Sequence, residues 1–255
     1  MSPLYLHRSG EGPAALFVHG FPLDHSMWSA QIEALSDVAT CLAVDLCGFG
    51  RSPWDGSEAL TMERHADDLV RVLDASGVER ADIIALSMGG YASLAMWERH
   101  PTRIRSMALV DTRAAADDAA GRSARDAAAA RLRAGERDGW TSDSIPKLVG
   151  PGASDSVHSS IRAMIDSTPV ETIVAALVGM RDRADRTETL ATIDVPTLVL
   201  CGEDDALTPP AMSREMAGHL PDSRLEIIPG AGHMAPMEAP EAVNAALRSF
   251  LLERR

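Results

Sequence analysis

The chain alternates between short apolar runs and stretches whose apolar residues recur at helical spacing, and this alternation restricts its possible folds most. The runs over residues 14–18 and 41–46 contain no regular polar alternation, which is typical of strands buried on both faces. Residues 62–73 carry apolar side chains three and four positions apart, which indicates a helix with one buried face. Strands that alternate with helices through short loops predict a parallel sheet covered by helices on both faces.

Seven segments are predicted to be strands, and several of them end in a polar residue or a glycine-rich turn. Because ligands bind beyond the carboxyl ends of parallel strands, we expect His19, Ser87 and Asp111 to meet at one edge of the sheet. The predicted strands are residues 4–6, 14–18, 41–46, 81–84, 106–110, 195–201 and 224–228.

The alternation of strand and helix patterns stops between the fifth and sixth predicted strands. Residues 114–139 are rich in alanine and charge, prolines and glycines divide the residues that follow, and no strand pattern is present. We therefore predict a helical cap over residues 112–193, inserted into a core made of residues 1–111 and 194–255.

Composition narrows the possible partners. A net charge of -13 without a long basic stretch argues against nucleic acid, and no apolar run approaches the ~18–20 residues of a membrane span. The first ten residues lack the pattern of a secretion signal, so we expect a cytoplasmic protein with no membrane partner. Three widely spaced cysteines argue against a disulfide framework or a cysteine-based zinc site. Cys41 and Cys201 are predicted to be buried, whereas Cys47 lies in a predicted loop and is expected to be more reactive.

A serine occupies the apex of a predicted strand–turn–helix, in Ala85-Leu86-Ser87-Met88-Gly89-Gly90. So tight a turn strains the serine backbone and requires small residues two positions before and after it. Ala85 and Gly89 meet that requirement, although glycine is usual at the first position. The motif alone is equally compatible with an ordinary turn or helix-capping serine.

Candidate residues to activate a nucleophilic serine follow later strands in the sequence. A serine hydroxyl needs a base to take its proton and an anion to orient that base. His233, in a glycine-rich turn, is the candidate base, and Asp205 is the candidate acid. Asp204 and Asp111 compete with Asp205 for this role.

Backbone amides are the candidate donors to an oxyanion. The predicted donors are the N–H groups of Phe21 and Met88, and His19 is expected to brace the loop that carries Phe21.

The order serine, acid, histidine is that of the α/β-hydrolases. The resemblance extends over five motifs: residues 19–24, 45–52, the serine turn, 202–209 and 230–233. The chain is most similar to the small bacterial carboxylesterase and 3-oxoadipate enol-lactonase-like group. This resemblance implies a mostly parallel eight-stranded sheet and a triad of Ser87, Asp205 and His233. Ala85 and Cys47 depart from the usual pattern.

These features lead to one functional hypothesis, hydrolysis of small to medium apolar carboxylic esters or lactones through an acyl-enzyme, without metal or cofactor. Leu177, Met180, Leu207 and Met234 are the candidate pocket residues, although packing in the cap or core explains them equally well. A carbon–carbon bond hydrolase, a perhydrolase, a thioesterase, an acyltransferase or a non-catalytic receptor of the same fold stays open, as does the oligomeric state.

Overall fold

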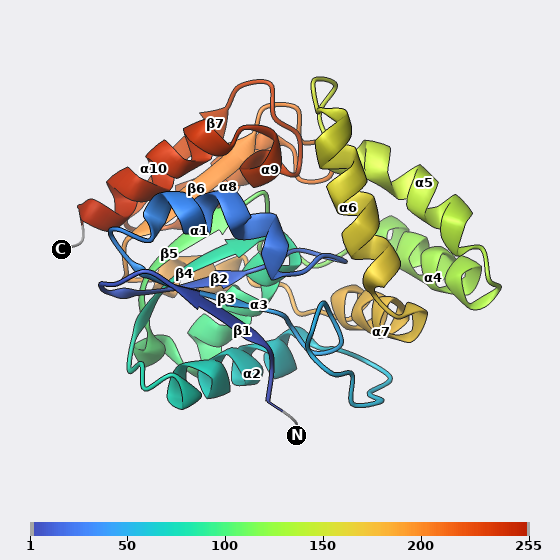
Figure 1. Cartoon of the computed structure of the whole chain (residues 1–255), viewed down its shortest axis with the longest axis horizontal. Coiled ribbons are helices and arrows are strands. Elements are labelled where there is room, and N and C mark those ends of the chain that lie inside the picture. The colour runs from blue at the N-terminus through green and yellow to red at the C-terminus, as the bar shows by residue number, and fades with distance from the viewer. Residues whose placement is uncertain (1–2, 254–255) are drawn as a thin grey trace.

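A seven-stranded sheet forms the centre of the computed structural model, which describes residues 3–253 (Figure 1). The strand order is β1-β3-β2-β4-β5-β6-β7; β1 runs antiparallel to β3, and all other pairs are parallel. The strands are β1 Leu6–Ser9, β2 Ala14–Val18, β3 Thr40–Val44, β4 Ala81–Leu86, β5 Ile104–Val110, β6 Thr197–Gly202 and β7 Ser223–Ile228. The mostly parallel α/β-hydrolase-type sheet is confirmed. The described residues form seven strands, the number predicted from the sequence pattern, and the first of them lies at Leu6–Ser9 rather than at residues 4–6. The number eight came from the resemblance alone.

The registers align the carboxyl ends of the central strands. Val18 pairs with Ala85, and Val110 pairs with both Leu86 and Leu200. The residues that directly follow β2, β4, β5 and β6 therefore emerge at one level of the sheet edge. This alignment brings together segments that are far apart in the sequence.

Helices cover both faces of the sheet, as the alternating pattern predicted. Helices α1 and α10 pack against each other on one face, and α2 and α3 pack together on the other (Figure 1). Three short 3-10 helices, η1 (His25–Trp28), η2 (Pro101–Arg103) and η3 (Glu188–Thr192), complete these layers. The α-helices outside the segment between β5 and β6 are α1 Ser29–Leu35, α2 Met62–Ala75, α3 Met88–Arg99, α8 Pro210–His219, α9 Ala235–Glu238 and α10 Pro240–Leu252.

Four α-helices lie between β5 and η3, to one side of the sheet, as Figure 1 shows in green to yellow. They are α4 Ala119–Arg133, α5 Arg137–Leu148, α6 Asp155–Ser167 and α7 Val170–Arg181. Pro146 lies within the last turn of α5, and Gly150 to Gly152 follow its end, so the proline- and glycine-rich stretch separates α5 from α6.

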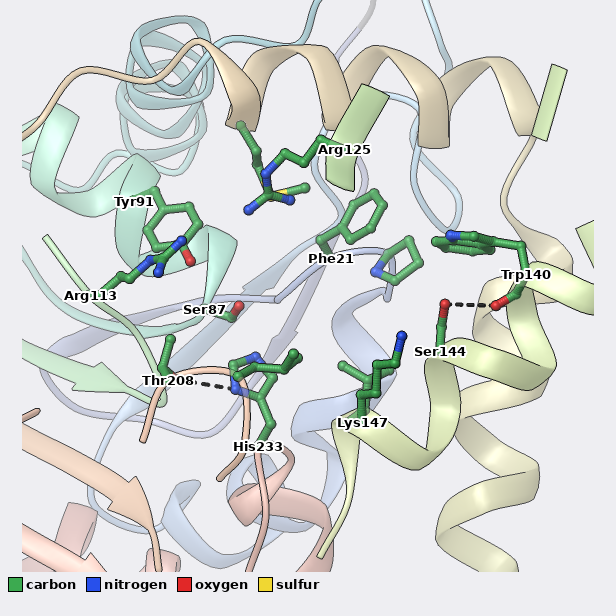
Figure 2. Close-up of a pocket in the computed structure, with 14 residues that line it drawn as sticks. Phe21, Ser87, Tyr91, Arg113, Arg125, Trp140, Ser144, Lys147, Thr208 and His233 are labelled. Carbon is green, nitrogen blue, oxygen red and sulfur yellow. Dashed lines mark hydrogen bonds between the residues drawn. The ribbon is translucent and has the colours of Figure 1, made fainter. Parts of the chain in front are cut away.

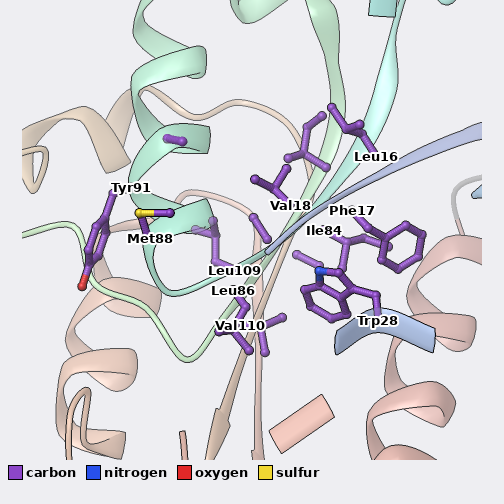
Figure 3. Packing of buried hydrophobic residues seen from close by; sticks show 14 of the residues in the cluster. Leu16, Phe17, Val18, Trp28, Ile84, Leu86, Met88, Tyr91, Leu109 and Val110 are labelled. Carbon is purple, nitrogen blue, oxygen red and sulfur yellow. The ribbon is translucent and has the colours of Figure 1, made fainter. Parts of the chain in front are cut away.

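Apolar side chains from the sheet and both helical layers form the core (Figure 3). Phe17 of β2 contacts Trp28 edge to face, with ring centroids 5.6 Å apart. Met88 and Tyr91 of α3 join the same cluster from the other side. Because the central strands have no exposed face, their sequences contain almost continuous apolar residues.

Cys47 differs from its prediction as a reactive loop thiol. It does lie in a loop, but its side chain is buried and contacts the carbonyl oxygen of Pro53 and the guanidinium of Arg64. Burial raises the pKa of the Cys47 thiol despite the nearby Arg64, so the thiol is kept protonated and enclosed. Cys41 and Cys201 are buried, as predicted.

Within residues 3–253, no individual helix combines the length and apolar character that crossing a membrane requires. Helices α6 and α7 meet those criteria only when taken together, and they are bent by 98° relative to each other.

Candidate active site

Ser87 stands at the junction of β4 and α3 with a positive φ of 52°, a conformation that non-glycine residues rarely adopt. Its backbone N–H donates to the carbonyl of Val110, 3.0 Å away, and its own carbonyl accepts the hydroxyl of Thr112 at 2.8 Å. Hydrogen bonds at the N–H and at the carbonyl of Ser87 therefore hold the turn. A strained strand-to-helix turn of this kind is typical of nucleophilic serines.

The small neighbours of Ser87 have different reasons for being small. A Cβ atom on Gly89 would lie 2.5 Å from the carbonyl oxygen of Val18, so any larger residue would push α3 away from the sheet. Ala85 lies within β4 and is fully buried between β2 and β5. The space there admits one methyl group, and Ala85 is not among the described residues with positive φ, so glycine is not required.

Asp205 and His233 form a buried hydrogen-bonded pair. Nδ1 of His233 donates to Oδ2 of Asp205 over 2.8 Å. Because a carboxylate only accepts, this bond places the proton on Nδ1 and leaves Nε2 as the acceptor nitrogen. Burial raises the pKa of Asp205, but the hydrogen bond from His233 and those from Thr208 outweigh it, so the pKa lies below its ordinary value.

The two competing carboxylates do not share this arrangement. Asp204 is exposed at the surface. Asp111 is buried, and its Oδ1 accepts the backbone N–H of Gly202 at 2.7 Å. Burial and the nearby charge of Asp205 raise the pKa of Asp111 well above its ordinary value. The pKa values of these two neighbouring carboxyl groups are therefore shifted in opposite directions, upward for Asp111 and downward for Asp205.

Thr208 is a site residue to which the sequence assigned no role. Its hydroxyl donates to Oδ2 of Asp205 at 2.6 Å, and its oxygen lies 3.3 Å from Nδ1 of His233. The N–H groups of Leu207 and Thr208 also donate to Oδ1 of Asp205. Both carboxylate oxygens are thus fixed, and the spacing of Thr208 three residues after the acid was the available signal.

Glu238 holds the loop that carries His233 and was also missed. Its carboxylate accepts the backbone N–H groups of Gly232 and Met234, both at 3.1 Å. It also accepts the N–H of Gly150, 2.7 Å away in the loop between α5 and α6. One carboxylate therefore ties the histidine loop to the helices that follow β5.

Of the two predicted oxyanion donors, Met88 directly follows Ser87 and Phe21 lines the same cavity as Ser87. Met88 is the first residue of α3, so its N–H has no acceptor within the helix. In the described part of the chain, no backbone carbonyl accepts the N–H of Phe21.

His19 holds the loop that carries Phe21. Its Nδ1 donates to the carbonyl of Gly20 at 2.8 Å, and its Nε2 accepts the N–H of Leu46 at 3.0 Å. Burial lowers the pKa of His19, which fits this neutral bridging form.

A cavity of about 240 Å³ opens over these groups (Figure 2). Ser87 and His233 both line it, together with Met180 and Leu207 among the predicted pocket residues. Leu177 and Met234 do not line it; both are buried in the hydrophobic core instead. The remaining lining residues are Phe21, Pro22, Tyr91, Arg113, Arg125, Trp140, Ser144, Lys147, Leu148 and Thr208.

A family model described as alpha/beta hydrolase fold matches residues 13–240. This chain belongs to the alpha/beta hydrolase family. A thermophilic esterase from Thermogutta terrifontis, solved with malate bound, superimposes with a TM-score of 0.95 at 38% identity, over 98% of this chain and 93% of that chain.

Two relatives of this chain carry names of different hydrolase activities. It is 31% identical to a Caulobacter sp. (strain K31) protein named "Putative carbamate hydrolase RutD", over 96% of this chain and 94% of the relative. It is 29% identical to 3-oxoadipate enol-lactonase 1 of Acinetobacter baylyi, over 90% and 85%. The family and these relatives support hydrolase activity and the predicted likeness to esterases and lactonases.

Proposed function

We propose that this alpha/beta hydrolase cleaves carboxylic esters or lactones through an acyl-enzyme formed on Ser87. The observation that carries the proposal is the strained Ser87 in one cavity with His233, whose Nδ1 is bound to the buried Asp205. The esterase and enol-lactonase among the similar proteins support the same reaction class.

In the proposed reaction, Nε2 of His233 takes the Ser87 proton as Oγ attacks the substrate carbonyl. Asp205 keeps the imidazole oriented and stabilises its positive charge. The N–H groups of Phe21 and Met88 donate to the oxyanion of the tetrahedral intermediate. His233 then returns the proton to the leaving alcohol, and a water molecule deprotonated by the same histidine releases the acid.

The first test replaces the nucleophile. Ser87→Ala is expected to lower kcat for p-nitrophenyl ester hydrolysis by roughly 10⁴–10⁶-fold, because without the hydroxyl no acyl-enzyme forms. An active-site phosphonate probe is expected to add its mass to Ser87 in the wild type and to leave the variant unmodified. Ester turnover by Ser87→Ala at the wild-type rate would overturn the proposal.

A substrate panel separates the related reactions that use the same three side chains. Esters, lactones and thioesters are compared by kcat/KM, and peracid or transesterified products are measured after adding peroxide or an alcohol. A preference for thioesters, for peroxide or for an alcohol over water would replace the proposed reaction by thioesterase, perhydrolase or acyltransferase activity. A protein that neither turns over any substrate nor reacts with the phosphonate would be a receptor.

A further inference from the structure

Three arginines surround a single buried carboxylate at one end of the cavity. Asp117 pairs with Arg113, with Arg125 and, at 2.9 Å, with Arg183, and the Asp117 side chain is only 1% exposed. Asp185 also attracts Arg183, but its oxygens accept the backbone N–H groups of Ala116 and Thr187. The cluster therefore holds three guanidinium charges around one fully buried anion.

The three arginines differ in whether they line the cavity. Arg183 donates to the carbonyls of Met180 and Ala115, both at 2.8 Å, and its guanidinium lies 4.2 Å from the centre of the Tyr91 ring. Its buried Nε finds no hydrogen-bond partner among residues 3–253, but Arg183 does not line the cavity. Arg183 is therefore a structural member of the cluster that a ligand in the cavity does not contact.

Arg113 and Arg125 line the cavity, and each has an N–H donor without a strong acceptor. Among residues 3–253, the buried Nε of Arg113 finds no hydrogen-bond partner. Nη1 of Arg125 is directed at Sδ of Met180, 3.5 Å away, which is a weak acceptor. Figure 2 shows both guanidinium groups on the same side of the cavity as Tyr91.

The cavity wall is positively charged in an acidic protein. The chain carries a net charge of -13, yet the residues that line this cavity include Arg113, Arg125 and Lys147 and no aspartate or glutamate. Lys147 is the one lysine of the chain, and it forms no ion pair with the described residues. Half-buried cations with incomplete partners are costly to desolvate unless an anion joins them.

We infer that the cavity binds esters or lactones that carry a carboxylate, with Arg113 and Arg125 binding that carboxylate while Ser87 attacks the ester carbonyl. The inference rests on the proposed function for the chemical step. A planar guanidinium matches a carboxylate through parallel N–H donors, and a ligand carboxylate would supply the acceptor that Met180 supplies poorly. Lys147 adds positive charge at the exposed rim and draws anions toward the opening. The sequence predicted small to medium apolar acyl substrates, and the arginines add a carboxylate to that expectation.

The test compares esters that differ only in one charged end. Monomethyl glutarate is matched with methyl pentanoate, and butanoyloxyacetate with ethyl butanoate, so that a methyl group replaces the carboxylate on the acyl side or on the alcohol side. The wild type is expected to favour the charged member of at least one pair by about tenfold or more in kcat/KM. Arg125→Gln is expected to lower kcat/KM for that ester by about 10- to 100-fold, and for its neutral partner by less than about threefold.

Variants of the same helix and cluster provide the controls. Arg125→Gln leaves Arg113 and Arg183 on Asp117, so the cluster keeps its anchor. Arg113→Gln is expected to have the same selective effect. Arg133→Gln removes an exposed charge from the last turn of α4, outside the cavity, and is expected to change neither ester.

The outcomes separate the subsite from the reaction. If the wild type hydrolyses the neutral esters equally well, or if Arg125→Gln slows both members of a pair alike, the carboxylate subsite is wrong and the proposed function stands. If no ester is hydrolysed, the proposed function fails, and the subsite is judged by calorimetric binding of monomethyl glutarate to the wild type. Binding weakened tenfold by Arg125→Gln then supports the subsite, and equal or absent binding overturns it.

Discussion

Two histidine–aspartate pairs in different regions of the molecule join Nδ1 of the imidazole to a fully buried carboxylate. His100 and Asp67 also pair, but through Nε2 and a partly exposed carboxylate. Nδ1 of His25 lies 2.7 Å from Asp45, and Nδ1 of His233 lies 2.8 Å from Asp205. Both carboxylates have fully buried side chains and accept additional backbone N–H groups, from His25 and Arg51 in one case and from Leu207 and Thr208 in the other.

The two pairs differ in what their imidazoles face. His233 lines the cavity that Ser87 also lines. The His25 ring lies against the rings of Tyr5 and His7, with centroids 5.0 and 5.9 Å away, and it is not part of the cavity. A histidine–aspartate pair is therefore a general way to fix a loop, and it becomes a base for catalysis only where its second nitrogen can reach a nucleophile.

The largest expected effect comes from disabling each pair in the same way. Asp205→Asn should lower kcat by about 10⁴-fold, because an amide can hold the imidazole in the wrong tautomer. It should also lower the free energy of unfolding by about 1–3 kcal/mol, because the N–H groups of Leu207 and Thr208 lose a charged acceptor. Asp45→Asn should leave kcat within a few-fold and lower the free energy of unfolding by about 1–3 kcal/mol, because backbone N–H groups of its loop lose a charged acceptor.

Steady-state kinetics and urea unfolding on both variants measure the two effects. The distinction between the regions breaks down if Asp45→Asn abolishes activity while the protein remains folded. It also breaks down if Asp205→Asn is fully active.

A smaller effect on kcat/KM is expected at Thr208, whose hydroxyl donates to Asp205. Among residues 3–253, the donors to the Asp45 carboxylate are His25 and the Arg51 backbone, so the His25–Asp45 pair has no equivalent hydroxyl. Thr208→Val removes the hydroxyl that donates to Asp205 and should lower kcat/KM by roughly tenfold, since one hydrogen bond to a charged group is lost. Thr208→Ser retains the hydroxyl and should stay within about threefold of the wild type. Equal losses in both variants would point to the methyl group rather than to the hydrogen bond.

The smallest effect concerns pH and the His25 pair. The hydrogen bond to Asp45 raises the pKa of His25 above its ordinary value of 6.5, against the opposing effect of burial. The stabilisation from this pair is therefore fully present below about pH 6.5 and is lost as pH rises through the higher pKa of the folded protein.

His25→Gln should accordingly destabilise the protein more at pH 6 than at pH 9, by on the order of 0.5–1 kcal/mol after solvent screening. Chemical unfolding of wild type and variant at both pH values gives this difference. An equal loss at the two pH values would mean that His25 contributes only by packing.

Local patterns in the sequence determined most of the framework. Continuous apolar runs located the strands β2 to β6, because a strand buried on both faces cannot carry regular polar residues. The first strand, predicted over residues 4–6, lies instead at Leu6–Ser9, because this partly exposed edge strand carries polar residues. The helix predicted over residues 62–73 is α2, Met62–Ala75, since apolar spacing acts within a few residues. The small residues around Ser87 indicated the tight turn for the same reason.

Tertiary structure alone decided which side chains meet. The sequence could not settle whether Asp111 or Asp205 faces His233, because the choice depends on loop paths that bring residues 28 positions apart into contact. The arginine cluster was hidden among many surface-like charges in an alanine-rich stretch. It becomes a cavity wall only because Arg183, far along the chain, joins Arg113 and Arg125 on Asp117. Sequence patterns report local burial, whereas charge pairing and cavity shape depend on how separate elements pack.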